Sequence, residues 1–275
     1  VVSHLNWTKK GLEPTYKASD PEYDKDEILG ILSEDLKSAV DIKEIIARFV
    51  DGSKFEEFKP LYGSSLVCGW STVHGYQVGI LGNNGPIYPE SAEKGASFIQ
   101  LCNKRNIPLI FLHNVTGFLV GKDFERQGII KKGSQLINAV SNSMVPHITF
   151  IVGASYGAGT YAMSGKAFNN RFTFLWPTAK IAVMGPEQMA GVMSIVRKAK
   201  AKRDGKKFDV KADKQLQEMV IDFLEKLSHG LVASSMLTDD GIIDPRDTRD
   251  IIGFCLSVVN NEIIEGAKEY GVFRL

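Results

Sequence analysis

The residues of this chain best suited to chemistry are a run of small ones, GASYGAG at 153–159, between an apolar stretch and a helical pattern. A strand that passes through such a run into a helix leaves backbone N–H groups without an intrahelical partner. Those donors and the helix dipole favour an oxyanion or a phosphate, and small residues let a ligand approach the backbone. The structural alternative is close helix–strand packing at a tight turn.

A second loop of small residues, GFLVG at 117–121, follows the neighbouring apolar run at 109–112. In open α/β sheets, ligands bind outside the carboxyl ends of the strands, so the two loops could face one pocket. The alternative for this loop is an ordinary connection in which the glycines supply positive φ angles. Together the two loops predict a ligand site without identifying the ligand.

The first segment also contains G-x-S-x-G at 153–157, a pattern that places a nucleophilic serine on a strained turn in α/β-hydrolases. Ser155 would be that nucleophile, and Asp222 and His229 follow it in the order of a hydrolase triad. Against this, the chain has no HGGG-type oxyanion loop, and His229 lies in a segment with a helical pattern. A serine hydrolase remains a hypothesis of a different class, as does a domain that serves only assembly.

Hydrophobic patterning predicts an α/β fold with a largely parallel sheet, because apolar strands alternate with helices. Strands are expected at 65–73, 76–81, 109–112, 148–152, 172–176 and 181–184. Between the first two, His74-Gly75 forms the turn. Helices are expected at 91–104, 128–143 and 249–266, with a helical excursion over 190–238.

The first 48 residues predict an arm with two short helices that meet at Asp41, a residue type that caps helix N-termini. The chain begins with Val1 rather than methionine, and its first residues have no signal or transit character. We therefore expect this sequence to be a fragment of a longer polypeptide.

Charge and composition argue against several classes of protein and site. Lys+Arg 33 against Asp+Glu 32 leaves a net charge of +1, which gives no electrostatic footprint for nucleic acid. No apolar run reaches the ~18 residues that a membrane span needs. The three cysteines are widely spaced, which favours reduced thiols, and the five histidines have no i, i+4 pairing, so no metal site is expected.

One strongly basic segment, 197–207, carries seven cations against one aspartate. A solvated helix face is the default explanation for such a run. The alternative is that some of these cations meet the phosphates of a nucleotide-bearing substrate.

Several segments carry a recognisable combination of motifs: NNG at 83–85, ESAEKG at 90–95, QLC at 100–102, RNIPL at 105–109, TGFLVG at 116–121, VP at 145–146, SYGAG at 155–159 and WPTA at 176–179. In this order they resemble the carboxyltransferase β subunit of biotin-dependent acyl-CoA carboxylases. Residues 171–185, 239–249 and 270–275 are most similar to the methylcrotonoyl-CoA carboxylase group within that family. The resemblance runs from about Asp41 to the C-terminus and is weaker over the arm.

The resemblance implies a crotonase-like ββα superhelix. It also implies a division into an interdomain linker and helical arm, 1–48, and a C-terminal carboxyltransferase-type domain, 49–275. In this family the N-terminal domain mainly binds acyl-CoA and the C-terminal domain mainly receives carboxybiotin. The active site forms where the two domains meet across protomers.

The resemblance also assigns site residues. The backbone N–H groups of Ala158 and Gly159 would form an oxyanion hole for the ureido oxygen of biotin. The biotin pocket would be lined by Gly117, Phe118, Tyr156 and Gly157. This chain has Gly-Ala-Gly-Thr where propionyl-CoA-type members have Gly-Gly-Ala, so the donor pair can differ by one residue between the two groups.

The implied reaction transfers CO2 from carboxybiotin to an acyl-CoA, with 3-methylcrotonoyl-CoA of leucine degradation as the first choice. Biotin would arrive on a partner α subunit, and the β subunits would form a hexamer, in the mitochondrial matrix if eukaryotic or the cytoplasm if bacterial. The alternatives within the class are a biotin-dependent acyl-CoA decarboxylase subunit and a carboxylase of propionyl-, acetyl- or geranyl-CoA.

Overall fold

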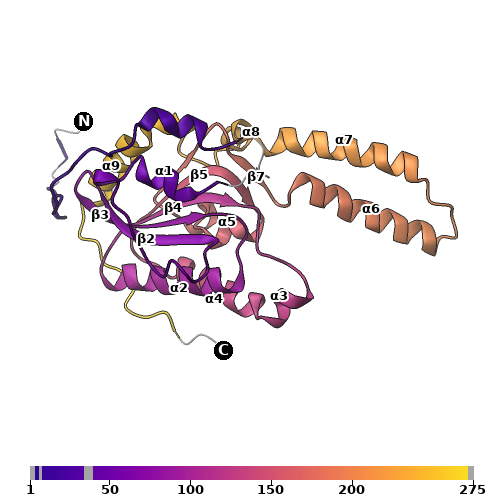
Figure 1. The fold of residues 1–275 in the computed structure, drawn as a ribbon, viewed down its shortest axis with the longest axis horizontal. Coiled ribbons are helices and arrows are strands. Elements are labelled where there is room, and N and C mark those ends of the chain that lie inside the picture. Colours follow the sequence, from indigo (N-terminus) through magenta and orange to yellow (C-terminus); the bar gives the residue numbers. More distant parts are fainter. Residues whose placement is uncertain (1–3, 6–7, 34–39, 272–275) are drawn as a thin grey trace.

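The computed structural model describes residues 4–5, 8–33 and 40–271, which form one α/β unit with a long helical projection (Figure 1). Within these residues a seven-stranded sheet has the order β1-β2-β3-β4-β5-β6, and β7 pairs with the end of β5. The strands are β1 (Glu56–Glu57), β2 (Leu66–Val73), β3 (Tyr76–Asn83), β4 (Leu109–Val115), β5 (His147–Tyr156), β6 (Phe172–Leu175) and β7 (Lys180–Ala182). Strands β3 to β6 are parallel, as the alternation of apolar strands and helices predicts.

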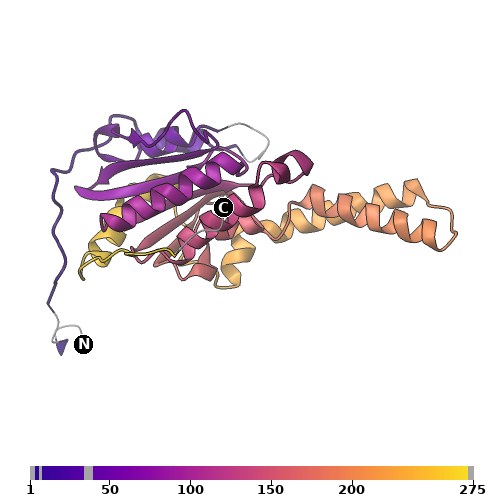
Figure 2. The ribbon, with the colours of Figure 1, turned by 90° about the horizontal axis from the view of Figure 1, so that it is seen from below.

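Helices cover both faces of this sheet (Figures 1 and 2). Ile110 and Leu112 of β4 belong to a core cluster that includes α1 (Ile42–Ala47) and α9 (Thr248–Val259). Leu109 and Phe111 belong to a second cluster, with α2 (Pro89–Lys104) and α4 (Ile129–Ser141). Successive strand residues point to opposite faces, so a strand buried on both sides must be continuously apolar.

The turn between β2 and β3 confirms the predicted hairpin. His74 and Gly75 have φ angles of 49° and 78°, the left-handed pair that a type I′ turn requires. The two strands pair in antiparallel register from Val73↔Tyr76 to Leu66↔Asn83. This hairpin and the helix α2 after it form the first ββα unit.

Several element boundaries differ from those expected, most by one to three residues, and three of the differences affect the description of the chain. Strand β5 extends to Tyr156, so most of the small-residue run is strand, and the strand expected at 181–184 lies at Lys180–Ala182. The helix expected to reach 266 ends at Val259, where the Asn260 side chain donates to the carbonyl of Leu256 at 2.8 Å and caps its own helix. Beyond it, the Gly266 N–H donates to the Asn106 side chain, which holds the chain against the end of α2.

The predicted helical excursion is a hairpin of two long antiparallel helices, α6 (Pro186–Arg203) and α7 (Val210–Ser228), that projects from the body (Figure 1). The Asp213 carboxylate of α7 holds the two helices together, since it accepts hydrogen bonds from Ser194 and Arg197 of α6. It also accepts one from Gln217 of its own helix. The short helix α8 (Gly230–Ser235) returns the chain to the sheet. Two further short helices, α3 (Lys122–Arg126) and α5 (Ala158–Ala162), follow β4 and β5.

Part of the predicted arm is visible. Asp41 caps α1, because its side chain accepts a hydrogen bond from the Lys43 N–H, as expected. The other expected helix is represented by a 3-10 helix, Lys25–Gly30, and its continuation over 34–39 lies outside the described residues. Ile42 and its neighbours on α1 belong to the same core as the sheet, and the division at residue 48 stays a prediction.

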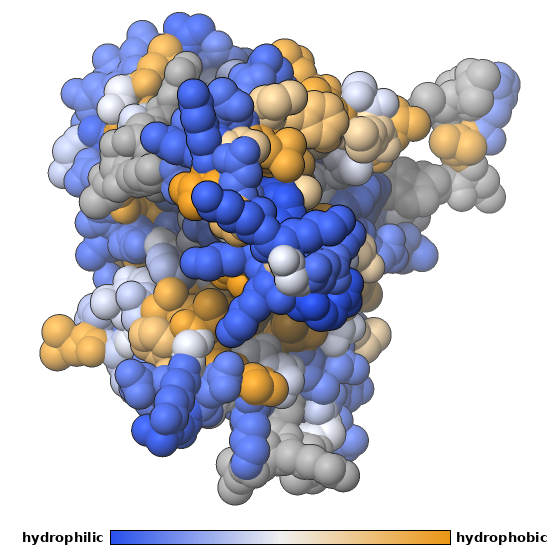
Figure 3. Space-filling model, turned by 90° about the vertical axis from the view of Figure 1, so that its right-hand side faces the viewer, coloured by the Kyte–Doolittle hydropathy of each residue, from blue (hydrophilic) through white to orange (hydrophobic). Residues whose placement is uncertain are grey.

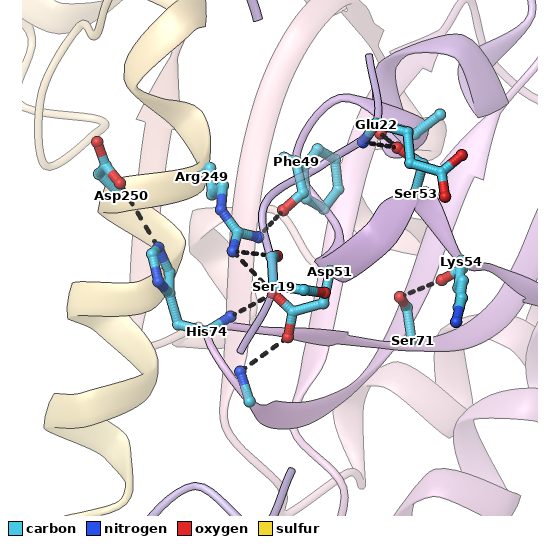
Figure 4. Close-up of polar contacts among 12 residues, drawn as sticks. Ser19, Glu22, Phe49, Asp51, Ser53, Lys54, Ser71, His74, Arg249 and Asp250 are labelled. Atoms are coloured by element: carbon cyan, nitrogen blue, oxygen red, sulfur yellow. Dashed lines mark hydrogen bonds and ion pairs between the residues drawn. The ribbon is translucent and has the colours of Figure 1, made fainter. Parts of the chain in front are cut away.

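A buried ion pair fastens the arm to the sheet and to α9 (Figure 4). Arg249 donates from Nη2 to Asp51 at 2.8 Å, and its guanidinium also reaches the carbonyls of Ser19 and Phe49. Asp51 accepts two more hydrogen bonds, from the N–H groups of His74 and Gly75 in the hairpin turn. One carboxylate thus connects three segments that are far apart in the sequence.

We expect Arg249→Ala to lower the free energy of unfolding by about 3 kcal/mol, because it leaves the buried Asp51 carboxylate without its counter-charge. Burial alone would raise the pKa of Asp51, but the Gly75 N–H and the guanidinium hold it below its usual range. The stabilisation is therefore complete above the unfolded pKa of about 4 and is lost as the pH falls through the folded value. Denaturant unfolding measures the change, with Lys226→Ala, which removes the exposed pair with Asp222, as the control. Equal losses in the two variants would contradict this role.

Candidate functional site

The turn from β5 into α5 has two consecutive backbone N–H groups that find no hydrogen-bond partner among the described residues. The Gly157 N–H donates to the Ala182 carbonyl at 2.9 Å, and Thr160 and Met163 donate to Gly157 and Gly159. Among the residues that the structure describes, no hydrogen bond is donated by the N–H of Ala158 or Gly159. These are the first two amides of α5, so no intrahelical acceptor exists for them.

Glycine is required at 157. Its φ is 55° and its ψ is −134°, a conformation that residues with a Cβ rarely adopt. A Cβ added there would also lie 2.9 Å from the Val183 carbonyl oxygen. The small-residue run is therefore needed to turn the chain sharply at the carboxyl end of β5, which leaves Ala158 exposed and Gly159 buried.

The structure brings the two small-residue loops together, as the sequence predicts. A Cβ on Gly159 would lie 2.9 Å from Val115 Cγ2 and 3.2 Å from Gly117 Cα. Loop 117–121 is held in place by Ile87, which donates to the Gly117 carbonyl and accepts from the Leu119 N–H. The backbone at Gly117 therefore lies directly against the β5–α5 turn.

Two other predicted pocket residues pack their side chains into the protein. A Cβ on Gly133 of α4 would lie 3.0 Å from the Phe118 ring, which is half-buried against the second core cluster. The Tyr156 side chain is buried near Gly185 at the start of α6, and burial raises its pKa. Both rings therefore support the loops from which they come.

Ser155 lies beneath the turn and forms a hydrogen bond that the sequence analysis missed. Its side chain is fully buried, and its Oγ is 2.9 Å from Nδ1 of His113 and 2.9 Å from Oγ1 of Thr160. The other ring nitrogen, Nε2, lies 2.6 Å from the Met163 carbonyl oxygen. Burial lowers the pKa of His113 to about 4, so the ring is neutral at pH 7.

The predicted hydrolase triad does not form. His229 is exposed at the start of α8, where its Nδ1 accepts from the Leu231 N–H, and Asp222 pairs with Lys226 on the exposed face of α7. Ser155 has no exposed surface for a substrate to reach, and its histidine partner is oriented by a carbonyl instead of a carboxylate. The one sequence signal for His113 is that it interrupts the apolar run of β4.

The basic segment covers the end of α6 and the loop after it, at the tip of the α6–α7 hairpin and far from the β5–α5 turn along the projection (Figure 1). The end-on view shows a hydrophilic surface at this tip (Figure 3). Arg197 is bound to Asp213, and the other six cations are exposed: Lys198, Lys200, Lys202, Arg203, Lys206 and Lys207. This placement favours the solvated face that is the default explanation.

No three or more His, Cys, Asp or Glu side chains in the described part of the chain are grouped as metal ligands would be. No helix in that part combines the length and apolar character needed to cross a membrane. The three cysteines are buried and unlinked, and burial raises the pKa of each thiol.

Four cavities of about 400 to 520 Å³ lie on the surface away from the β5–α5 turn. The one of 520 Å³ lies between α2 and α4, near Lys59, Tyr62 and Glu93. None of these four cavities is lined by Gly117 or by the β5–α5 turn.

Comparison with known proteins identifies the family and the fold of this chain. The family model described as the carboxyl transferase domain matches residues 1–272. A probable biotin-dependent acyl-coenzyme A carboxylase beta2 subunit of Mycobacterium tuberculosis is 52% identical over 276 residues, which cover all of this chain and 52% of that protein. The mitochondrial methylcrotonoyl-CoA carboxylase beta chain of Dictyostelium discoideum is 44% identical, over all of this chain and 47% of that protein.

A solved structure extends the similarity to the fold. The beta subunit of Pseudomonas aeruginosa geranyl-CoA carboxylase superposes with a TM-score of 0.88 at 41% identity, over all of this chain and 52% of that one. The predicted crotonase-like fold is thereby confirmed, and this chain spans about half the length of the relatives it matches. Because the family model matches residues 1–272, almost the whole of this sequence, the chain belongs to the carboxyl transferase domain family of biotin-dependent enzymes.

Proposed function

We propose that this chain is the biotin-accepting half of an acyl-CoA carboxyltransferase. The observation that carries the proposal is the pair of unpartnered N–H groups at Ala158 and Gly159, at the carboxyl end of a parallel strand. Membership of the carboxyl transferase family supplies the reaction class. The residues present fit biotin, because Gly157, Ala158 and Gly159 carry no side chain larger than a methyl group beside the amides that an oxyanion would approach.

Carboxybiotin, when bound, supplies the CO2 group and leaves negative charge on its ureido oxygen. The Ala158 and Gly159 amides donate hydrogen bonds to the place where this charge develops. The turn holds them fixed in advance, so they need no reorganisation during the reaction, and losing one such donor costs about 3–4 kcal/mol. No side chain acts as a nucleophile in this scheme, which agrees with the burial of Ser155.

The remaining site residues act through their backbones and their packing. Gly117 and Gly157 keep Cβ atoms away from the approach to the amides, and both have positive φ. The buried Tyr156 and the half-buried Phe118 fix the two loops that form the floor of the proposed biotin pocket.

We further propose 3-methylcrotonoyl-CoA as the substrate, on the similarity to the Dictyostelium beta chain. The similarity to the geranyl-CoA carboxylase subunit makes geranyl-CoA the second candidate. Biotin would be carried by a partner α subunit, and the complete β subunit would form a hexamer. Exposed apolar side chains on the helical hairpin, such as Ile195 and Phe223, supply surface for assembly. The compartment would be the mitochondrial matrix in a eukaryote and the cytoplasm in a bacterium.

The test is incorporation of labelled bicarbonate by the complete β subunit with its biotin-carrying partner. We expect kcat/KM to be highest for 3-methylcrotonoyl-CoA in a panel that also contains geranyl-, propionyl- and acetyl-CoA. A pocket that fits a branched unsaturated acyl group would be left partly empty by propionyl or acetyl groups, and each missing methylene would cost about 1–3 kcal/mol. A preference for any other acyl-CoA of the panel would contradict the proposed substrate, and incorporation into none of the four would contradict the function.

A further inference from the structure

A series of buried hydrogen bonds beneath the turn has no part in the proposed mechanism. It runs from the Met163 carbonyl through the imidazole of His113 to Ser155 and Thr160, with distances of 2.6, 2.9 and 2.9 Å. His113 and Ser155 are both fully buried. Burial of a polar group is costly unless the group is hydrogen-bonded, and each of these four polar groups has a hydrogen-bond partner.

We propose that His113 is a positioning residue that clamps α5, and with it the Ala158 and Gly159 amides, by hydrogen bonds from the two edges of one ring. The proposal rests on the proposed function. It differs from a catalytic role because the ring touches no substrate and has no exposed surface.

The hydrogen-bond directions follow from the acceptor at one end. The Met163 carbonyl can only accept, so Nε2 carries the proton and Nδ1 is the unprotonated nitrogen. Nδ1 therefore accepts from the Ser155 hydroxyl, and Ser155 Oγ accepts in turn from the Thr160 hydroxyl. The neutral ring, which its pKa of about 4 ensures at pH 7, is the only form that can accept at Nδ1.

These contacts reach both ends of α5. Thr160 lies in the first turn of the helix, directly after the two unpartnered amides, and Met163 is its C-cap. A helix of five residues has too few internal hydrogen bonds to hold its own orientation. The imidazole comes from β4, a buried strand in the middle of the sheet, and therefore ties the short helix to the centre of the sheet.

The test is steady-state kinetics of the complete β subunit with its biotin-carrying partner. We expect His113→Leu and Ser155→Ala each to lower kcat about 10- to 100-fold, since a displacement of about 1 Å at a reacting centre has effects of this size. The KM for acyl-CoA should change less than about twofold. The double variant should lose no more kcat than either single variant, because each substitution already breaks the same series of hydrogen bonds.

A conservative variant separates positioning from simple packing. His113→Gln should restore kcat to within about threefold of the original protein, because an amide offers both an acceptor for Ser155 and a donor for Met163. The matched control is His147→Leu, which removes another buried histidine on β5 whose ring contacts Ser143 and Ser164. His147→Leu should lower the free energy of unfolding about as much as His113→Leu does, but it should have little effect on kcat.

Each outcome decides something. Absence of transfer in the original complex overturns the proposed function. An active complex whose kcat is unchanged in both His113→Leu and Ser155→Ala overturns the positioning role alone. An equal loss of kcat in His147→Leu would assign the effect to packing and also overturn that role. If His113→Leu does not fold, Ser155→Ala, which removes a single oxygen atom, decides the question.

Discussion

Replacing Gly159 with valine is expected to lower kcat about 10²- to 10³-fold, the usual effect of losing one oxyanion donor. A Cβ at this position would lie 2.9 Å from Val115 Cγ2 and 3.2 Å from Gly117 Cα. The two added methyl groups find no room between the turn and loop 117–121, so the turn must move and its amides with it. The KM for acyl-CoA should stay nearly unchanged, because the resemblance places most of the acyl-CoA site in the other domain.

Steady-state kinetics of the complete carboxylase measure this change. Gly30→Val is the matched control, since a Cβ on Gly30 would meet nothing within 4 Å and the residue is exposed. A Gly159→Val enzyme with the same kcat as the control would remove Gly159 from the site. A rise in KM without a fall in kcat would instead assign Gly159 to substrate binding.

The second large effect concerns the 275-residue chain by itself, for which we expect no measurable carboxylation of any acyl-CoA. The chain covers 52% of the mycobacterial relative and 47% of the Dictyostelium one. The resemblance implies that the active site forms between two kinds of domain, of which this chain holds one. The Ala158 and Gly159 amides alone hold no acyl-CoA, and without a fixed second reactant the large advantage of proximity is lost.

Incorporation of labelled bicarbonate measures this, with the chain alone and with the complete β subunit compared beside the same biotin-carrying partner. The complete subunit is the positive control for the partner and the assay. Carboxylation by the isolated chain at more than a trace of the complete rate would refute the composite site, and would place the acyl-CoA site within these 275 residues.

Local features of the sequence determined much of the fold. The continuously apolar runs predicted the buried parallel strands, His74-Gly75 predicted the hairpin turn, and Asp41 predicted a helix cap. Each of these depends on residues within a few positions of one another, so periodicity and turn chemistry are sufficient. The same holds for the glycine at 157, which the turn needs whatever surrounds it.

The hydrogen-bond partner of Ser155 is a feature that only the tertiary structure decided. The sequence suggested Asp222 and His229 as partners of Ser155 because they follow in the right order, but both are exposed on the helical projection or beside it. The actual partner of Ser155 is His113, 42 residues earlier. That pairing depends on how β4 and β5 lie side by side, and on an irregularity in their register between His113 and Val115.

Order along the chain carries no information about which side chains face one another across a sheet, because strand register is fixed by packing on both faces. The sequence by itself therefore determined the family, the α/β class and the turn that carries the amides. The folded structure decided that those amides have no hydrogen-bond partner within its described residues, and that Gly117 lies against them. It also decided that a neutral, buried imidazole bonds to Ser155 and to the Met163 carbonyl behind them.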